Sequence, residues 1–96
     1  MSRTRYLVSY DVCEPKRLRR VAKTMEGFGT RIQYSVFECA MDELRLQRLK
    51  SELHPLLHHE EDQVLFVSLG PEDSSQGLRI EAMGQPYTVR SRVTIV

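Results

Sequence analysis

The side chains of this sequence that could do chemistry together are one carboxylate and the cluster of basic residues that follows it. Asp11 follows the apolar run Tyr6–Tyr10. A carboxylate at the end of a buried strand is costly unless it is paired, hydrogen-bonded or bound to a metal. The basic residues that follow it have the chemistry that binds phosphate. This combination suggests phosphodiester chemistry, and the alternative is that Asp11 only ends the strand and begins a turn.

The charge is distributed unevenly along the chain. The formal net charge is +1, but residues 1–32 carry eight basic and three acidic side chains, whereas residues 33–66 carry three basic and seven acidic ones. Such asymmetry favours a half that faces nucleic acid, with solvated helix faces as the alternative. The candidate nucleic-acid-binding residues are Lys16, Arg17, Arg19, Arg20, Lys23 and Arg31.

The length of 96 residues predicts one domain over residues 1–96, whose small core would gain from oligomerisation. No apolar run is as long as the roughly 20 residues of a membrane span. The first residues do not read as a secretory leader, so we expect a cytoplasmic protein and no membrane partner. Cys13 and Cys39 fit no zinc spacing, and we expect no disulfide between them in a reducing compartment.

The first half of the chain predicts a strand, a helix and one or two further strands. Residues 3–11 are rich in β-branched and aromatic side chains and end at a turn signal. Pro15 suits the first turn of a helix that Gly27 and Gly29 would end. Residues 31–40 predict a second strand. The apolar face of the helix has the spacing i, i+3, i+4, i+7 and consists of Leu18, Val21, Ala22 and Met25.

The second half predicts a helix and three strands. Asp42 is a candidate N-cap, and the buried stripe behind it is formed by Leu46, Leu49, Leu53 and Leu56. Residues 58–62 read as a polar loop without metal-ligand spacing. Residues 63–69 are almost continuously apolar, which predicts a central strand. Residues 78–83 predict a short strand, and residues 89–96 a final one.

The order of elements is β-α-β-β-α-β if residues 31–40 form two strands, and β-α-β-α-β-β if they form one. Either order leaves a C-terminal strand, about residues 89–96, that a four-stranded sheet does not need. A spare strand in a small domain is a candidate for pairing with the sheet edge of another protomer.

Three segments read together resemble the CRISPR-associated protein 2 family, the small subunit of the machinery that captures foreign DNA. They are Tyr6–Val12, Arg19–Lys23 leading to Gly29–Glu38, and Asp62–Leu69. The resemblance implies an α+β, ferredoxin-like β-α-β-β-α-β sandwich that forms a homodimer, with the C-terminal strand added to the partner protomer. It also implies a magnesium-dependent endonuclease that cuts RNA or double-stranded DNA, and a DNA-binding bridge for the integrase subunit, CRISPR-associated protein 1.

The resemblance assigns the metal and the catalytic role to Asp11, because the strand-ending aspartate is the metal ligand of this family. One carboxylate is a poor Mg²⁺ site, since magnesium usually takes one or two carboxylates with waters and substrate phosphate. A two-fold axis would bring two copies of Asp11 together, and two close carboxylates favour a bound cation. Tyr10 and Phe37 are candidate neighbours of this site, and core packing is the alternative for both.

Three other functions stay open at this point. The first is a non-enzymatic DNA-binding scaffold that uses the arginines and not Asp11. The second is a messenger-RNA-cleaving toxin of similar fold, to which the family looks distantly related. The third is a ferredoxin-like regulatory domain for a small molecule, which fits least because such a domain has no need of an arginine-rich first helix.

Overall fold

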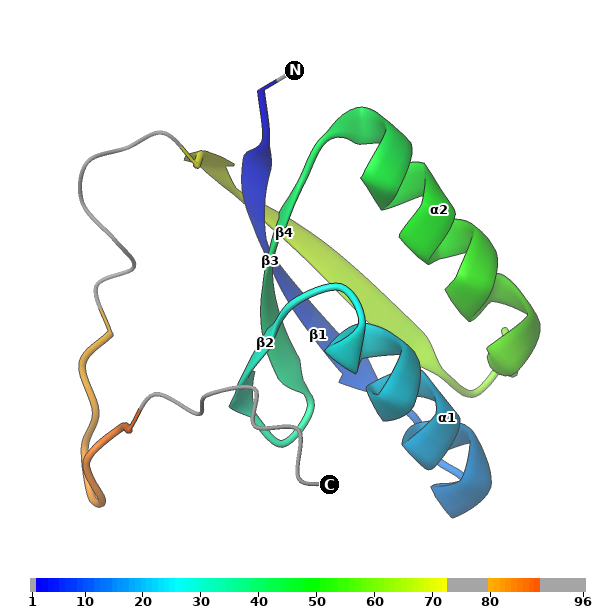
Figure 1. Ribbon diagram of the computed structural model, residues 1–96. Coiled ribbons are helices and arrows are strands. Elements are labelled where there is room, and N and C mark those ends of the chain that lie inside the picture. The colour runs from blue at the N-terminus through cyan, green and yellow to red at the C-terminus, as the bar shows by residue number, and fades with distance from the viewer. Residues whose placement is uncertain (1, 73–79, 89–96) are drawn as a thin grey trace, which may run out of the picture.

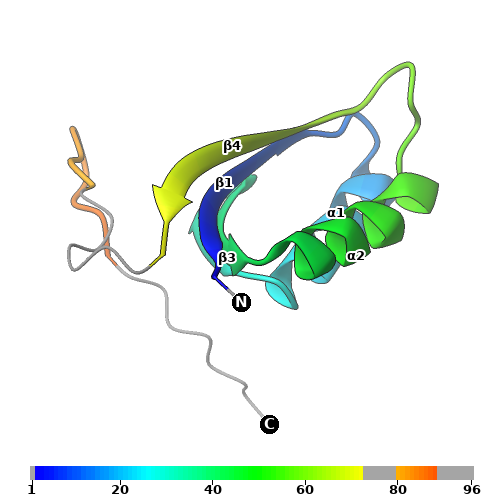
Figure 2. The same cartoon turned by 90° about the horizontal axis from the view of Figure 1, so that it is seen from above.

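The computed structural model describes residues 2–72 and 80–88. The elements are β1 (Thr4–Asp11), α1 (Pro15–Glu26), β2 (Thr30–Gln33), β3 (Val36–Met41), α2 (Glu43–Leu53), the short 3₁₀ helix η1 (His54–Leu56) and β4 (Gln63–Pro71). The four strands pair in the order β2-β3-β1-β4, and every pair is antiparallel. Both helices cover one face of this sheet (Figures 1 and 2). This arrangement is the ferredoxin-like β-α-β-β-α-β sandwich that the family resemblance implies.

Residues 31–40 could form one strand or two by sequence alone. In the structure, a two-residue turn at Tyr34 and Ser35 divides them. β2 and β3 form a hairpin in which Thr30 lies opposite Glu38. The turn contains Ser35 but none of the stronger turn residues Gly, Pro, Asn and Asp. The single-strand interpretation of residues 31–40 is therefore wrong, and the two-strand interpretation is confirmed.

β4 lies at the edge of the sheet in the described part of the chain, so the prediction of a central strand is wrong. Its apolar run has another origin. Val64 and Phe66 pack against the core, whereas the side chains of Leu65, Val67 and Leu69 alternate to the other face. An apolar residue at nearly every position therefore reflects two apolar faces, of which one is partly exposed in the described part of the chain.

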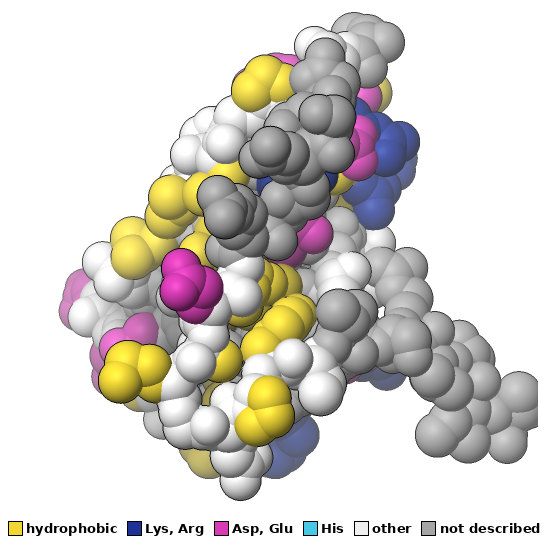
Figure 3. Space-filling model, turned by 90° about the vertical axis from the view of Figure 1, so that its left-hand side faces the viewer, with side chains coloured by type: hydrophobic (Ala, Val, Ile, Leu, Met, Phe, Trp, Pro, Cys, Tyr) yellow, Lys and Arg dark blue, Asp and Glu magenta, His cyan; other side chains and the backbone are white. Residues whose placement is uncertain are grey.

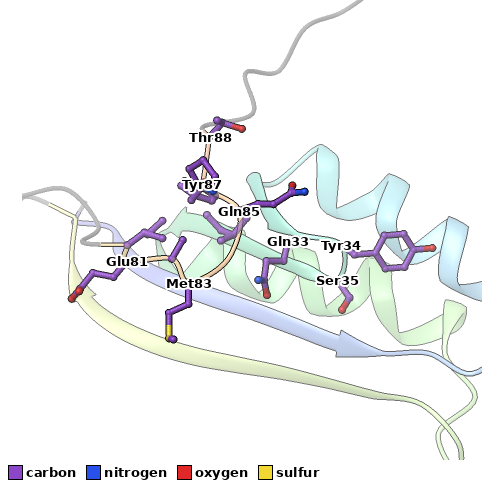
Figure 4. A pocket seen from close by; sticks show the side chains of 12 residues that line it. Gln33, Tyr34, Ser35, Glu81, Met83, Gln85, Tyr87 and Thr88 are labelled. Carbon is purple, nitrogen blue, oxygen red and sulfur yellow. The ribbon is translucent and has the colours of Figure 1, made fainter.

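Residues 80–88 have no regular secondary structure, so the strand predicted for residues 78–83 is not formed in its described part. Ile80 is partly exposed and Met83 fully exposed, and no burial stabilises a strand here. The segment lies on the side of the sheet away from the helices (Figure 2). It and the β2–β3 turn enclose a hollow of about 680 Å³ (Figure 4). Residues 78–79 and the predicted strand at 89–96 lie outside the described residues.

The core lies between the helices and the sheet, and the predicted helix faces supply it. Val21 and Met25 of α1 are buried, as are Leu46, Leu49 and Leu53 of α2, whereas Leu56 lies in η1 and is only partly buried. The Asp42 carboxylate accepts a hydrogen bond from the backbone N–H of Arg45, which confirms Asp42 as an N-cap. Glu14 caps α1 in the same way. These local signals place α1 directly after the strand that ends at Asp11.

Gly29 allows the α1–β2 loop to cross closely over β3. A Cβ at this position would collide with the backbone carbonyl of Glu38 and with the sulfur of Cys39. Cys13 and Cys39 are both free thiols, and burial raises the pKa of Cys39 to about 12. In residues 2–72 and 80–88, none of the helices has the length and apolar character needed to cross a membrane.

Candidate functional site

Asp11 is the last residue of β1, and its side chain is on the sheet face opposite to the helices. Tyr10 and Val12 on either side of it are buried in the core, and alternation along the strand places Asp11 on the other face. Its cross-strand neighbour is Gln63 of β4. Within the described residues the exposed Asp11 carboxylate makes no hydrogen bond or ion pair. It is therefore free to bind a ligand.

The carboxylate chemistry around Asp11 fits a magnesium ion only in part. The described ranges contain no group of three or more His, Cys, Asp or Glu side chains that could hold a metal ion. Magnesium is commonly bound through one or two carboxylates, with waters and substrate phosphate completing the octahedron. Asp11 supplies one carboxylate, and a second copy of the chain would supply the other.

The sheet face that carries Asp11 is apolar along β4 and partly exposed there among the described residues. Leu65, Val67 and Leu69 are between 43% and 49% exposed. Leu7 of β1 lies opposite Val67, so the apolar side chains of the two strands are adjacent. Figure 3 shows hydrophobic side chains gathered across this side of the molecule. An exposed apolar patch of this kind is typical of a protein interface.

Tyr10 and Phe37 lie on the other face, in the core. Both side chains are buried, and their ring centroids are 6.2 Å apart. The structure therefore places them behind the strand that carries Asp11 and does not bring them beside its carboxylate. Burial raises the pKa of Tyr10, against the influence of the neighbouring Arg31 guanidinium.

Arg17 is engaged by two acidic residues of the loop before β4. Its Nε donates to Oδ2 of Asp62 at 2.8 Å, and its Nη2 donates to Oε1 of Glu61 at 3.1 Å. The Asp62 carboxylate also accepts from the backbone N–H groups of Cys13 at 3.0 Å and His58 at 2.9 Å. The Asp62 side chain is 0% exposed. This network ties the β1–α1 loop, directly after Asp11, to the start of β4.

Acidification is expected to weaken this network. The Arg17 guanidinium, assisted by the N–H groups of His58 and Cys13, holds the pKa of Asp62 well below its usual range. A carboxyl whose pKa is depressed on folding stabilises the fold above its unfolded pKa of about 4, and this contribution declines as the pH falls below that value. The melting temperature of the wild type should therefore fall between about pH 5 and pH 3.

Asp62→Asn tests this expectation. At pH 7 we expect it to lower the melting temperature by about 5–10 °C, because it removes the charge that pairs with Arg17. Its melting temperature should also vary less with pH than that of the wild type over the acidic range. Glu60→Gln, in the same loop, is the matched control. Equal pH dependence of Asp62→Asn and wild type, measured by thermal unfolding, would show that Asp62 does not stabilise the fold.

In the described part of the chain, the other predicted basic residues form no ion pair with a carboxylate. Lys16, Arg19, Arg20 and Lys23 are exposed on α1. Arg31 of β2 is half-buried, with its guanidinium 5.2 Å from the centroid of the Phe37 ring. A groove between α1 and the β2–β3 hairpin brings together Arg19, Lys23 and Arg31.

The structure thus separates the predicted site residues into four places, of which the core holds Tyr10 and Phe37. Asp11 is on the open sheet face, Arg17 is in the Asp62 network, and the remaining cations are on or beside α1. Sequence reasoning missed Asp62 and Tyr34. The argument used for Asp11, that a carboxylate beside an apolar strand needs a partner, applies equally to Asp62. Nothing in the sequence marks Tyr34 as an exposed turn residue.

The family model described as CRISPR associated protein Cas2 matches residues 4–76. The CRISPR-associated endoribonuclease Cas2 of Geobacter sulfurreducens is 34% identical over 91 residues, which cover 95% of both chains. The CRISPR-associated endonuclease Cas2 of Halalkalibacterium halodurans is 44% identical over 69 residues, covering 67% of this chain and 72% of that one. The crystal structure of Streptococcus pyogenes Cas2 has a TM-score of 0.71 and 34% identity, covering 83% of this chain and 99% of that one.

Proposed function

The chain belongs to the Cas2 family of CRISPR-associated proteins, and we propose that it is a homodimeric endonuclease of the CRISPR adaptation system. It hydrolyses phosphodiester bonds in RNA or double-stranded DNA in the cytoplasm. The observation that carries this proposal is the exposed Asp11 carboxylate, which has no partner in the described chain and lies on an uncovered apolar sheet face. The names of the two relatives, an endoribonuclease and an endonuclease, support the class of reaction.

The uncovered face supports the homodimer. Burial of Leu65, Val67 and Leu69 against a second copy would remove their apolar surface from water, which drives association. Because Asp11 ends a strand of the same face, an isologous contact would also bring the two Asp11 side chains toward one another. The C-terminal strand about residues 89–96 is proposed to extend the partner's sheet at the free edge of β4.

The two Asp11 carboxylates of such a dimer are the residues that would hold Mg²⁺. A bound magnesium ion would lower the pKa of a coordinated water and stabilise charge on the phosphate. The chain's own contribution is to hold each Asp11 in a fixed place. The buried Tyr10 and Val12 anchor the end of β1 on one side of Asp11, and the Asp62 network anchors the loop that follows.

Binding of double-stranded DNA is the second part of the proposal, as a bridge for the integrase subunit. The cations of α1 lie on the side of the sheet away from Asp11, so DNA can be held there without any contribution from the carboxylate. This separation favours the non-enzymatic DNA-binding scaffold as the alternative function. Arginine and lysine contacts to phosphates carry little sequence information, so binding should be almost independent of sequence.

A cleavage assay separates the nuclease from the scaffold. Labelled RNA and double-stranded DNA are incubated with the protein in magnesium or in a chelator, and wild type is compared with Asp11→Asn. Cleavage that needs both magnesium and Asp11 supports the nuclease. DNA binding by a wild type that cleaves neither substrate would support the scaffold instead.

The double variant Lys16→Ala/Arg20→Ala is expected to weaken duplex binding and to reduce the slope of log K against log salt by about 2, roughly one for each lost phosphate contact. Arg17→Ala should leave the slope unchanged, because Arg17 is paired with Asp62 and Glu61. Arg48→Ala, on the exposed side of α2, is the control for a lost surface charge. Affinities are measured by fluorescence anisotropy at several salt concentrations. An unchanged slope in the double variant would mean that α1 does not contact DNA.

A further inference from the structure

The groove between α1 and the β2–β3 hairpin has a volume of about 460 Å³. It lies on the helix side of the sheet, away from Asp11. Its charged and aromatic lining consists of Arg19, Lys23, Glu26, Arg31, Tyr10 and Tyr34. The volume is within the range of about 300–1,000 Å³ that is usual for small-ligand pockets.

The charges of the groove favour an anion. Three cations and one carboxylate line it, and in the described residues none of the three cations is in an ion pair. The Nε of Arg31 is shielded from solvent and has no hydrogen-bond acceptor among the described residues, while the guanidinium interacts with the Tyr10 hydroxyl. A buried donor without an acceptor is costly, and a native structure usually explains such a group by a ligand, an ion or a water. A phosphate in the groove would be attracted by the positive charges of Arg19, Lys23 and Arg31.

Tyr34 adds an aromatic surface to the cations. Its side chain is 70% exposed at the tip of the hairpin, and its ring points away from the segment 80–88 (Figure 4). Such exposure of a large aromatic side chain at the edge of a cationic groove is typical of proteins that stack nucleobases. The turn that carries Tyr34 is held by two contacts. The Tyr10 backbone N–H donates to the Ser35 carbonyl at 3.0 Å, and the Tyr10 hydroxyl donates to the Tyr34 carbonyl at 3.5 Å.

We propose that this groove binds one unpaired nucleotide of a nucleic-acid strand. The phosphate lies against Arg19, Lys23 and Arg31, and the base stacks on the Tyr34 ring. A base inside a duplex is stacked and paired on both sides and does not present its face, so the groove selects a single-stranded end next to a duplex. The inference rests on the proposed nucleic-acid binding and adds a specificity for unpaired ends.

The test compares three labelled DNA duplexes in the presence of a chelator, which prevents magnesium-dependent cleavage. The first has blunt ends, the second has a two-nucleotide single-stranded extension, and the third has the same extension with both bases removed. The wild type should bind the extended duplex more tightly than the blunt one. Removal of the two bases should reduce this preference, because the contacts of the phosphates with the three cations remain but nothing stacks on Tyr34.

Tyr34→Ala should weaken binding of the extended duplex by about 5- to 100-fold and leave binding of the blunt duplex unchanged. Tyr34→Phe should retain the preference, because it keeps the ring. Arg31→Ala should weaken binding of both extended duplexes, with and without the two bases, because it removes a phosphate contact in the groove. Arg48→Ala is its matched control. Removal of the bases should have no further effect on Tyr34→Ala, since the same stacking contact is already lost.

Two results would overturn the inference and leave the proposed function intact. One is salt-dependent binding of the blunt duplex without any preference for the extended one. The other is an equal loss of affinity for both duplexes in Tyr34→Ala. A protein that binds none of the three duplexes would overturn the inference and the proposed DNA binding together.

Discussion

Asp11→Asn is expected to lower phosphodiester cleavage by about 100-fold or more, the order of magnitude that follows when one charge-stabilising group is removed from an active site. Asparagine has nearly the size of aspartate but lacks the charge that attracts a cation. The fold should not change, because the Asp11 side chain is exposed and makes no hydrogen bond within the described residues. Initial rates of cleavage of labelled RNA and double-stranded DNA, at saturating magnesium, measure the effect.

DNA binding is the internal control for this variant. It should persist or increase slightly in Asp11→Asn, since a negative charge is lost and the α1 cations are on the other side of the sheet. Glu52→Gln, which neutralises an exposed carboxylate of α2, should cleave at the wild-type rate. Cleavage that continues at full rate in Asp11→Asn would place the active site elsewhere.

The double variant Leu65→Glu/Val67→Glu is expected to convert the proposed homodimer into a monomer and, with it, to abolish the proposed cleavage. Both side chains are about half exposed on the open sheet face, so two glutamates are tolerated in a single chain. In a dimer they would place four carboxylates in an apolar contact, and burial of unpaired charges is prohibitive. Light scattering should give the mass of two chains for wild type and of one chain for the variant.

Two measurements keep this second prediction independent of misfolding. Circular dichroism and thermal unfolding should show a folded variant, and Arg31-dependent binding in the groove should persist because the groove is on the helix side of the sheet. Leu44→Glu, an exposed apolar residue of α2, is the matched control and should remain dimeric. A wild type with the mass of one chain, or a double variant with the mass of two, would contradict the use of this face for the dimer.

The sequence by itself determined the features that depend on neighbouring residues. The apolar spacing of both helices, the N-cap at Asp42 and the placement of Asp11 at the end of the first strand all appear in the structure as predicted. Each follows from local periodicity or from a side chain that bonds its own backbone, so a short window of sequence contains the whole cause. The same window could not decide between one strand and two at residues 31–40, because the alternation of Ile32, Tyr34 and Val36 continues through the turn and no Gly, Pro, Asn or Asp interrupts it.

Only the tertiary structure decided on which face of the sheet each side chain lies and which side chain it contacts. Arg17 reads as a phosphate contact among its basic neighbours, yet it pairs with Asp62, 45 residues away in sequence. The continuous apolar run of β4 is the same for a central strand and for an edge strand with an uncovered face. Asp11 and the α1 cations are close in sequence but on opposite faces of the sheet. Contacts over such distances depend on how the layers pack, and no local pattern contains that information.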